Sequence, residues 1–220
     1  LLAAMAGIAV GLPSLRLKGD YLAIVTLGFG EIIRVVLLNI EAVGGARGMY
    51  GIPKQTNFFW ALAWVCICII TIVRIMHSTH GRAFLAVRED EIAAEAMGIN
   101  TTRYKVRAFV ISAFFAGVAG SLFGHYLSYL NPGIFNFMKS IDVVVMVVLG
   151  GMGSITGSVV AAVIITLLPE ALRPLQEWTT IDFRMVIYSF MLIVLMLTRP
   201  AGLFGTKEAI DIFRKFFKKA

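Results

Sequence analysis

The feature that most constrains this chain is a series of apolar blocks, each close to the length that crosses a lipid bilayer. Residues 21–40, 57–76 and 109–130 are the clearest of them. A membrane-spanning helix takes roughly 20 apolar residues, and lipid offers the backbone no hydrogen-bond partner. Hydrophobic residues make up 59% of the chain and charged residues only 15%, which argues against a soluble domain. The sequence therefore predicts an all-α fold, a polytopic transmembrane helical bundle.

Two further blocks extend the predicted bundle. Residues 1–12 are apolar from the first position and follow no basic stretch, so we expect a helix of an N-terminally truncated chain rather than a signal peptide. Residues 183–198 form the last predicted span. Because no repeat or linker divides the sequence, residues 1–220 are expected to form a single transmembrane domain.

Basic residues lie at the ends of the apolar blocks rather than on a soluble face. They gather in residues 13–20, in residues 77–107 and in the tail from Arg199, whereas residues 170–182 hold three acidic residues and one basic residue. Basic loops stay on the cytoplasmic side of a membrane, so these three segments are predicted to be cytoplasmic in a multi-pass protein of the cytoplasmic (inner) membrane. The net charge of +7 then suits a lipid bilayer, and nucleic-acid binding is not expected.

The apolar segment 141–168 is interrupted by glycines. The predicted orientation requires an even number of crossings between residues 107 and 199, and each half of this segment is too short for a straight span. We therefore expect at least one discontinuous or re-entrant helix, with its break at residues 150–154 buried in protein.

The polar stretch at residues 77–107 is predicted to hold two short helices. They cover residues 82–88 and 91–97, and the second has Asp90 as its N-cap and Gly98 as its stop. A face rich in alanine is too slight for a core and suits a shallow groove on another protein. A helix that lies on its own membrane domain is the alternative. The residues that share this face are Ile92, Ala93, Ala96 and Met97.

These residues resemble the cytoplasmic coupling loop of ABC-importer permeases, whose Glu-Ala-Ala…Gly signature docks into ATPase subunits. The matching stretch here is residues 95–98, in which the glycine lies closer to the Glu-Ala pair than in the general signature. That spacing is similar to branched-chain amino acid permeases of the LivM/LivH type, and most similar to LivM. Four more stretches support the resemblance in the same order: residues 17–31, 44–53, 148–154 and 199–205.

The resemblance implies a permease subunit of an ATP-binding cassette importer for leucine, isoleucine or valine. It also implies two ATPase subunits, a second homologous permease and an extracytoplasmic amino-acid-binding protein as partners. Permeases for urea, amides or other amino acids share this scaffold, so the substrate stays open between these classes. The residues assigned to ATPase coupling are Glu91, Ala93, Glu95, Ala96 and Gly98.

Polar and glycine residues within the apolar segments are candidates for the translocation path. Glu31 and Arg34 lie three apart, so they can share one side of a helix. They either border an aqueous path or form a pair that reaches the headgroups. Glycines expose backbone dipoles to a zwitterion, although glycines in membrane helices more often serve packing. The residues assigned to the path are Thr26, Gly28, Gly30, Glu31, Gly150 and Gly151.

Residues 109–130 also carry two rows of small residues at four-residue spacing, which allow close helix approach. We expect one row to pack within the subunit and the other against a partner permease. The rows are Ala113, Gly117 and Ser121, and Ala116, Gly120 and Gly124.

The sequence holds no set of side chains that suggests catalysis. It shows no nucleophile–base pair and no Walker-type loop, so ATP hydrolysis is expected on separate subunits and no cofactor is expected. His77 and His80 come without a third nearby ligand, so no metal site is expected. A stand-alone carrier or channel is the rival interpretation, but only Glu31, Arg34 and Asp142 lie at membrane depth for ion coupling.

Overall fold

The computed structural model describes residues 1–15, 17, 19–171, 189–190, 193, 202–203 and 205. The chain divides into two compact units, Leu1–Phe137 and Met138–Ala220, and each is described by itself. The predicted span 183–198 lies almost wholly outside the described residues, as do the basic tail and the side chains of Arg16 and Lys18. The prediction of one domain stays a prediction.

Helices make up most of the first unit. Three of them are long and apolar enough to cross a membrane: α2, α3 and α6. Their apolar side chains stay exposed, among them Ile24 on α2 and Ile70 on α3, as expected for surfaces that face lipid or another subunit. The three clearest predicted spans are thereby confirmed as helices. The helices of this unit are α1 (Leu2–Ser14), α2 (Asp20–Asn39), α3 (Phe58–Met76), α4 (Thr79–Glu89), α5 (Glu91–Ala96) and α6 (Thr101–Leu127).

Several predicted helix boundaries were wrong, among them the start of α4, at Thr79 rather than residue 82, and the end of α6, at Leu127 rather than residue 130. The first helix does not end at residue 12 but continues through Pro13 to Ser14, and the Leu15 N–H closes its last turn by donating to the Gly11 carbonyl at 3.0 Å. The helix expected from residue 109 begins at Thr101. The Asn100 side chain accepts a hydrogen bond from the Arg103 N–H at 2.9 Å, so a cap starts the helix inside the basic stretch.

One row of small residues on α6 packs against α1. A Cβ added at Gly7 of α1 would lie 2.7 Å from the Cβ of Ala113, and one added at Gly117 would collide with Ala3. This confirms that one small-residue row packs within the subunit. In the other row, a Cβ at Gly120 would meet nothing within 4 Å among the described residues, and its packing against a partner stays a prediction.

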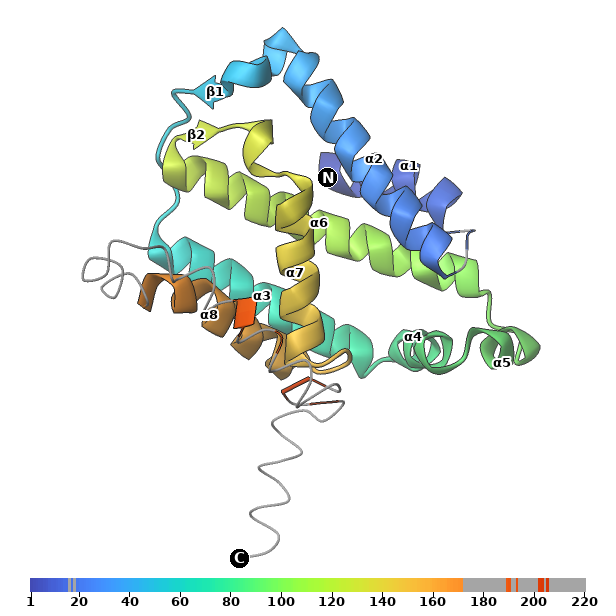
Figure 1. The fold of residues 1–220 in the computed structure, drawn as a ribbon. Coiled ribbons are helices and arrows are strands. Elements are labelled where there is room, and N and C mark those ends of the chain that lie inside the picture. The colour runs from blue at the N-terminus through green and yellow to red at the C-terminus, as the bar shows by residue number, and fades with distance from the viewer. Residues whose placement is uncertain are drawn as a thin grey trace, which may run out of the picture. The chain divides into compact units, whose positions relative to one another are not determined.

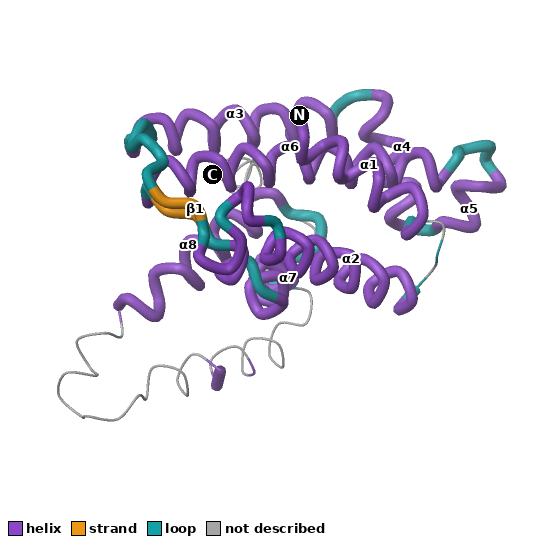
Figure 2. Tube along the Cα trace, turned by 90° about the horizontal axis from the view of Figure 1, so that it is seen from above, coloured by secondary structure: helices purple, strands orange, loops and turns teal. Residues whose placement is uncertain are grey.

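The C-terminal end of α6 carries a short strand pair that the sequence analysis did not expect. β1 (Met49–Tyr50) pairs antiparallel with β2 (Tyr129–Leu130), and Met49 lies opposite Leu130. This pair and α5 lie at opposite ends of α6 (Figure 1, Figure 2). Gly48 makes the pairing possible, since its φ is +78° and a Cβ there would lie 2.8 Å from the Leu130 carbonyl oxygen. Short 3₁₀ turns flank the strands: η1 (Glu41–Val43), η2 (Gly45–Arg47) and η3 (Pro132–Ile134).

The second unit contains α7 (Phe137–Gly150) and α8 (Ile155–Ala171), which a four-residue turn at 151–154 joins. The apolar segment is therefore two helices with a break at the predicted glycines. Ser154 is 2% exposed, and its hydroxyl accepts from the Gly157 N–H at 3.0 Å, which caps α8. The core of this unit consists of Leu149, Ala161 and Ile165.

Candidate functional site

The loop between α3 and α6 forms two capped helices, α4 and α5. Asp90 is the N-cap of α5, as predicted, and its carboxylate accepts from the N–H groups of Ile92 and Ala93 at 2.9 and 3.0 Å. At the other end Gly98 has a φ of +81°. Its N–H donates to the Glu95 carbonyl, and the next N–H, that of Ile99, donates to the Ala94 carbonyl at 3.0 Å. Both bonds are those of a Schellman motif, so the predicted stop at Gly98 is confirmed.

Two of the predicted coupling residues turn toward their own chain. The Thr101 hydroxyl, on a residue that is 2% exposed, donates to the Glu95 carboxylate at 2.7 Å. The Lys105 ammonium lies 2.6 Å from the Glu91 carboxylate. Glu91 and Glu95 are four apart on α5, so they share one side of the helix. Together they fasten α5 to the first turns of α6.

The other side of α5 is open. Ile92 is 76% exposed and Met97 is 82% exposed, and Ala93 and Ala96 are exposed beside them. Ala94 is buried at 3% and marks the side that faces the chain. We call the four exposed residues the α5 face.

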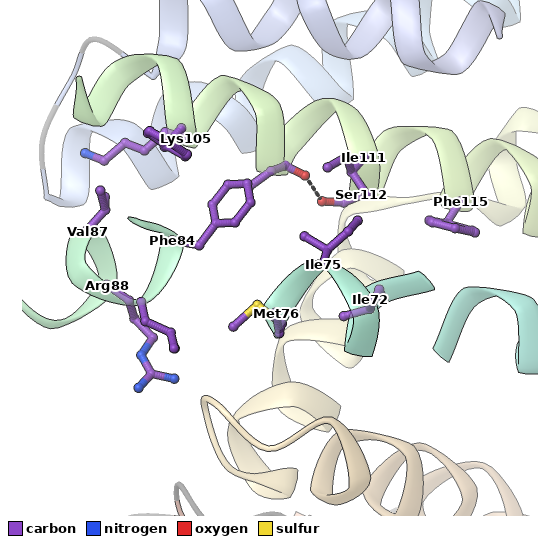
Figure 3. Close-up of a pocket in the computed structure, with 13 residues that line it drawn as sticks. Ile72, Ile75, Met76, Phe84, Val87, Arg88, Lys105, Ile111, Ser112 and Phe115 are labelled. Carbon is purple, nitrogen blue, oxygen red and sulfur yellow. Dashed lines mark hydrogen bonds between the residues drawn. The ribbon is translucent and has the colours of Figure 1, made fainter. Parts of the chain in front are cut away.

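An apolar hollow of about 660 Å³ lies where α3, α4 and α6 meet, and we call it the Phe84 pocket. In Figure 3 the Phe84 ring of α4 points between Ile75 of α3 and Ile111 of α6. Lys105 and Arg88 lie at the end away from Phe115. Beside the pocket α4 contacts α6 directly, since the rings of Phe84 and Tyr104 lie 5.3 Å apart and meet edge to face.

The predicted path residues on α2 make mostly local contacts. Thr26 donates to the carbonyls of Leu22 and Ala23 at 2.9 and 3.0 Å, so its hydroxyl is satisfied by its own helix. Arg34 donates through Nε to both carboxylate oxygens of Glu31 at 2.9 and 3.0 Å, and through Nη2 to Oε1. The predicted pairing of Glu31 with Arg34 is confirmed.

A second hollow of about 410 Å³ lies beside Arg34, and we call it the Arg34 pocket. Gly30 lines it, whereas Gly28 does not. Its other walls come from distant parts of the chain: Val43 and Met49 before and on β1, Gly120 on α6, and Leu130 and Phe135 after α6. No sequence pattern marks these residues as a set, because each is an ordinary apolar or glycine position in its own segment.

Long-range hydrogen bonds hold the walls of the Arg34 pocket together. Asn131 donates through Nδ2 to the Ala46 carbonyl at 3.3 Å, and the Tyr129 hydroxyl donates to the Arg47 carbonyl at 3.2 Å. The rings of Tyr50 and Tyr129 lie 4.5 Å apart, and the hydrogen bond with Tyr129 raises the pKa of Tyr50. The glycine loop at residues 44–51 is thus fastened to the segment after α6.

The last two predicted path residues lie in the second unit. A Cβ at Gly150 would lie 2.6 Å from the carbonyl oxygen of Gly157, so Gly150 allows α7 to approach α8 closely. Gly151 is buried and has a φ of +110°, a conformation that favours glycine. Within their unit Gly150 therefore serves helix packing and Gly151 serves a turn. Packing was the alternative to substrate contact that the sequence left open.

A family model described as "Branched-chain amino acid transport system / permease component" matches residues 1–196. The chain belongs to this family. The high-affinity branched-chain amino acid transport system permease protein LivM of Salmonella typhimurium is 40% identical over 92% of this chain. LivH of the same organism is 35% identical over 83% of this chain, and the probable LivM of Methanocaldococcus jannaschii is 29% identical over 96%.

Membership of this permease family confirms the resemblance seen in the sequence, with higher identity to the Salmonella LivM than to its LivH. The chain thus belongs to a family of membrane permeases and has three helices, among its described residues, that are long and apolar enough to cross a membrane. The chain spans 55% of the length of the Salmonella LivM, 58% of LivH and 68% of the archaeal protein. No solved structure matches the chain.

Proposed function

We propose that the chain is the membrane-spanning subunit of an ATP-binding cassette importer that carries leucine, isoleucine and valine across the cytoplasmic membrane. The observation that carries the proposal is the family match over residues 1–196, together with relatives named as branched-chain amino acid permeases. In this proposal the chain is one membrane domain that supplies helices and a path, and separate subunits hydrolyse ATP.

The proposed orientation places residues 77–107 and the C-terminal tail in the cytoplasm. Exposed Arg82, Arg88 and Arg103 lie at or near the N-terminal end of α6 and support it. Exposed aromatic residues, Tyr50 and Trp60, belong to the segments at the other end, where an interfacial aromatic belt is expected. Helix α6 has 27 residues and is about 40 Å long at 1.5 Å per residue, enough to join the two surfaces.

In the proposed coupling mechanism, the α5 face docks into an ATPase subunit. Ala93 and Ala96 permit close contact because their side chains are small, and Ile92 and Met97 add apolar area around them. Glu91 and Glu95 transmit the movement, since they tie α5 to Thr101 and Lys105 at the start of α6. Gly98 ends the helix so that this geometry holds. Closure of the ATPases would then rock α6 and alternate access to the path.

The proposed partners are two ATPase subunits, a second homologous permease and an extracytoplasmic amino-acid-binding protein. Relatives in the family carry two permease names, LivM and LivH, which supports a pair of permeases. The exposed Ala116 of the open α6 row is a candidate contact for the second permease, because small residues allow close helix approach.

The residues proposed for the path belong to α2 in the first unit and to the break between α7 and α8 in the second unit. Residues Thr26, Gly28, Gly30 and Glu31 lie on α2, and Gly150 and Gly151 lie at the break. We propose that α7 and α8 form a discontinuous or re-entrant helix, in which the turn at 151–154 presents backbone dipoles near the membrane midplane. The polar backbone of such a break is tolerated in a membrane only where protein or water surrounds it.

The test is ATP-driven uptake of labelled leucine by the complete transporter in vesicles, with Ala96→Glu as the coupling variant. A carboxylate buried without a partner costs several kcal/mol, so uptake and ATPase co-purification should fall by about a hundredfold or more. Gln55→Glu is the control, because it adds the same charge at an exposed position in the segment that leads from β1 to α3. This variant should keep both its leucine uptake and its ATPase subunits.

Competition with valine, alanine, urea and glutamate measures the substrate class. If leucine does not enter under ATP, the substrate assignment is wrong while the permease family stands. If Ala96→Glu keeps its ATPases and its uptake, the α5 face is not the docking surface.

A further inference from the structure

The Arg34 pocket combines one cation with walls that are otherwise apolar. Helix α2 contributes Ile33, Arg34 and Leu37, and the segments at the C-terminal end of α6 contribute Met49, Leu130 and Phe135. Its volume of about 410 Å³ lies within the range of roughly 300–1,000 Å³ that is usual for small-molecule sites. All of its walls belong to the first unit.

Arg34 keeps hydrogen-bonding capacity for a ligand. Its Nε and Nη2 atoms donate to Glu31, whereas its Nη1 atom has no hydrogen-bond partner in the described part of the chain. The side chain is 25% exposed and that of Glu31 is 42% exposed, so the pair is half-buried and still reachable. A guanidinium with free donors in an apolar hollow fits a carboxylate better than any neutral group.

We propose that the Arg34 pocket binds a free α-amino acid with an aliphatic side chain. Arg34 lines the pocket and binds the α-carboxylate, and the apolar walls enclose the side chain. Glu31 does not line the pocket itself, but it is hydrogen-bonded to Arg34 and binds the α-ammonium group from beside it. The inference rests on the proposed function and adds to it a specific site, at the end of α6 opposite α5. In the proposed orientation this site faces the extracytoplasmic side, where substrate enters.

Charge balance supports a zwitterion as the occupant. Glu31 and Arg34 form a neutral pair, so a ligand with one positive and one negative group leaves no net charge in the half-buried site. A ligand with only one charge would leave one member of the pair without a counter-charge, which is unfavourable away from water.

The apolar walls support an aliphatic side chain. Ile33, Leu37, Val43, Met49 and Leu130 are aliphatic, and Pro132 and Phe135 complete the wall. One methylene in an apolar pocket changes affinity by roughly 10–200-fold. Leucine should therefore bind at least about tenfold tighter than alanine, and glutamate should bind poorly, because its second carboxylate would lie against this wall.

The experiment measures equilibrium binding of labelled leucine to the purified complex of permeases and ATPases, without the binding protein. Competitors are leucinamide, which lacks the carboxylate, and 4-methylpentanoate, which lacks the amine. We expect Arg34→Gln to weaken leucine binding at least about tenfold and to remove the preference for leucine over leucinamide. Glu31→Gln should instead remove the preference for leucine over 4-methylpentanoate.

A third variant tests the pocket without touching the ion pair. Gly120→Leu places a side chain in the Arg34 pocket, and a Cβ there meets nothing within 4 Å among the described residues, so the substitution does not disturb the packing of this unit. It should weaken leucine binding more than alanine binding. Ala119→Leu, at the exposed neighbouring position outside the pocket lining, is the matched control and should bind leucine as the unaltered protein does.

Two results would overturn the inference. One is the absence of leucine binding to the unaltered complex at millimolar concentration. The other is unchanged affinity and unchanged preference in Arg34→Gln and Gly120→Leu. Either result, with ATP-driven leucine uptake intact, leaves the proposed function standing, whereas loss of uptake by the unaltered transporter removes the proposed function itself.

Discussion

The two ends of α6 differ in how the rest of the chain meets them. At the N-terminal end α5 is fastened by Glu95 to Thr101, which lies six residues along the chain. At the C-terminal end, the glycine loop is fastened through Tyr129 and Asn131, at 82 and 85 positions along the chain. The first end projects a small apolar helix, and the second encloses a hollow.

This difference suits two different tasks. Helix α5 is capped at both ends, and its Glu91 and Glu95 carboxylates bind the start of α6. The two helices therefore move together, so a displacement of α5 also displaces α6. A hollow whose walls come from separate segments opens and closes when those segments shift relative to one another. The comparison therefore predicts that damage at the N-terminal end uncouples the protein, whereas damage at the C-terminal end changes what it binds.

The largest loss of stability and of ATP-driven uptake is expected from Gly81→Ala, at the start of α4 just after α3. A Cβ at this buried position would collide with the Met76 carbonyl and lie 2.5 Å from the Ile75 carbonyl oxygen, and backbone atoms cannot move aside as a side-chain tip does. Overpacking of this kind costs about 1–3 kcal/mol, more than the roughly 0.5–1 kcal/mol that alanine gains over glycine in a helix.

We therefore expect Gly81→Ala to lower the Tm of the purified subunit and to reduce ATP-driven uptake strongly, while leucine binding changes little. Gly120→Ala is the control for stability, because its Cβ meets open space among the described residues, and its Tm should stay equal or rise. Equal Tm values for the two variants would show that α4 is not packed tightly against the end of α3.

Asn131→Ala should have a smaller effect, and it should change leucine binding rather than ATPase coupling. Its Nδ2 donates to the Ala46 carbonyl and to the Tyr129 hydroxyl at 2.9 Å, and its Oδ1 accepts from the Gly133 N–H at 2.7 Å. Each such bond contributes about 0.5–1.5 kcal/mol net. Loss of all three should loosen residues 44–50 and speed their amide hydrogen exchange by about tenfold or more.

Leucine binding should weaken in Asn131→Ala while the ATPases stay bound, which is the reverse of the pattern for Gly81→Ala. Asn57→Ala is the matched control, since Asn57 is exposed and makes no side-chain cap bond at the start of α3. If exchange in residues 44–50 is the same in both asparagine variants, the side chain of Asn131 does not hold the glycine loop.

The same contrast explains what the sequence could and could not predict. Asp90 and Gly98 were identified because caps depend on neighbours within a few residues. The start of α6 was missed because Arg103 and Lys105 are polar, and apolarity was used to find spans. The walls of the Arg34 pocket could not be predicted, since Met49 and Leu130 meet only through a strand pair that joins distant segments.

Gly150 shows a different limit. A glycine between apolar residues has the same sequence signal whether it exposes its backbone to a substrate or admits another helix. The approach of Gly157 shows that Gly150 admits another helix within its unit. Whether a glycine packs against a helix depends on which distant residue approaches it, so a local sequence pattern cannot predict this role.

The smallest effect concerns the ion pair that fastens α5 to α6. The Lys105 and Glu91 side chains are 19% and 26% exposed and their charged atoms lie 2.6 Å apart. A double-mutant cycle with Lys105→Met and Glu91→Gln should give a coupling free energy of about 0.5–1 kcal/mol, measured by thermal unfolding. Screening by salt should lower it.

Arg88 and Glu89 provide the matched cycle, because they also form an ion pair but are 40% and 69% exposed and adjacent on α4. Their coupling should be close to zero, since water competes for both groups and the pair joins no second element. A larger value for Glu91 and Lys105 means that charge contributes to holding α5 on α6. Equal values would assign that task to the half-buried hydrogen bond between Thr101 and Glu95, and ATPase coupling should then survive high salt unchanged.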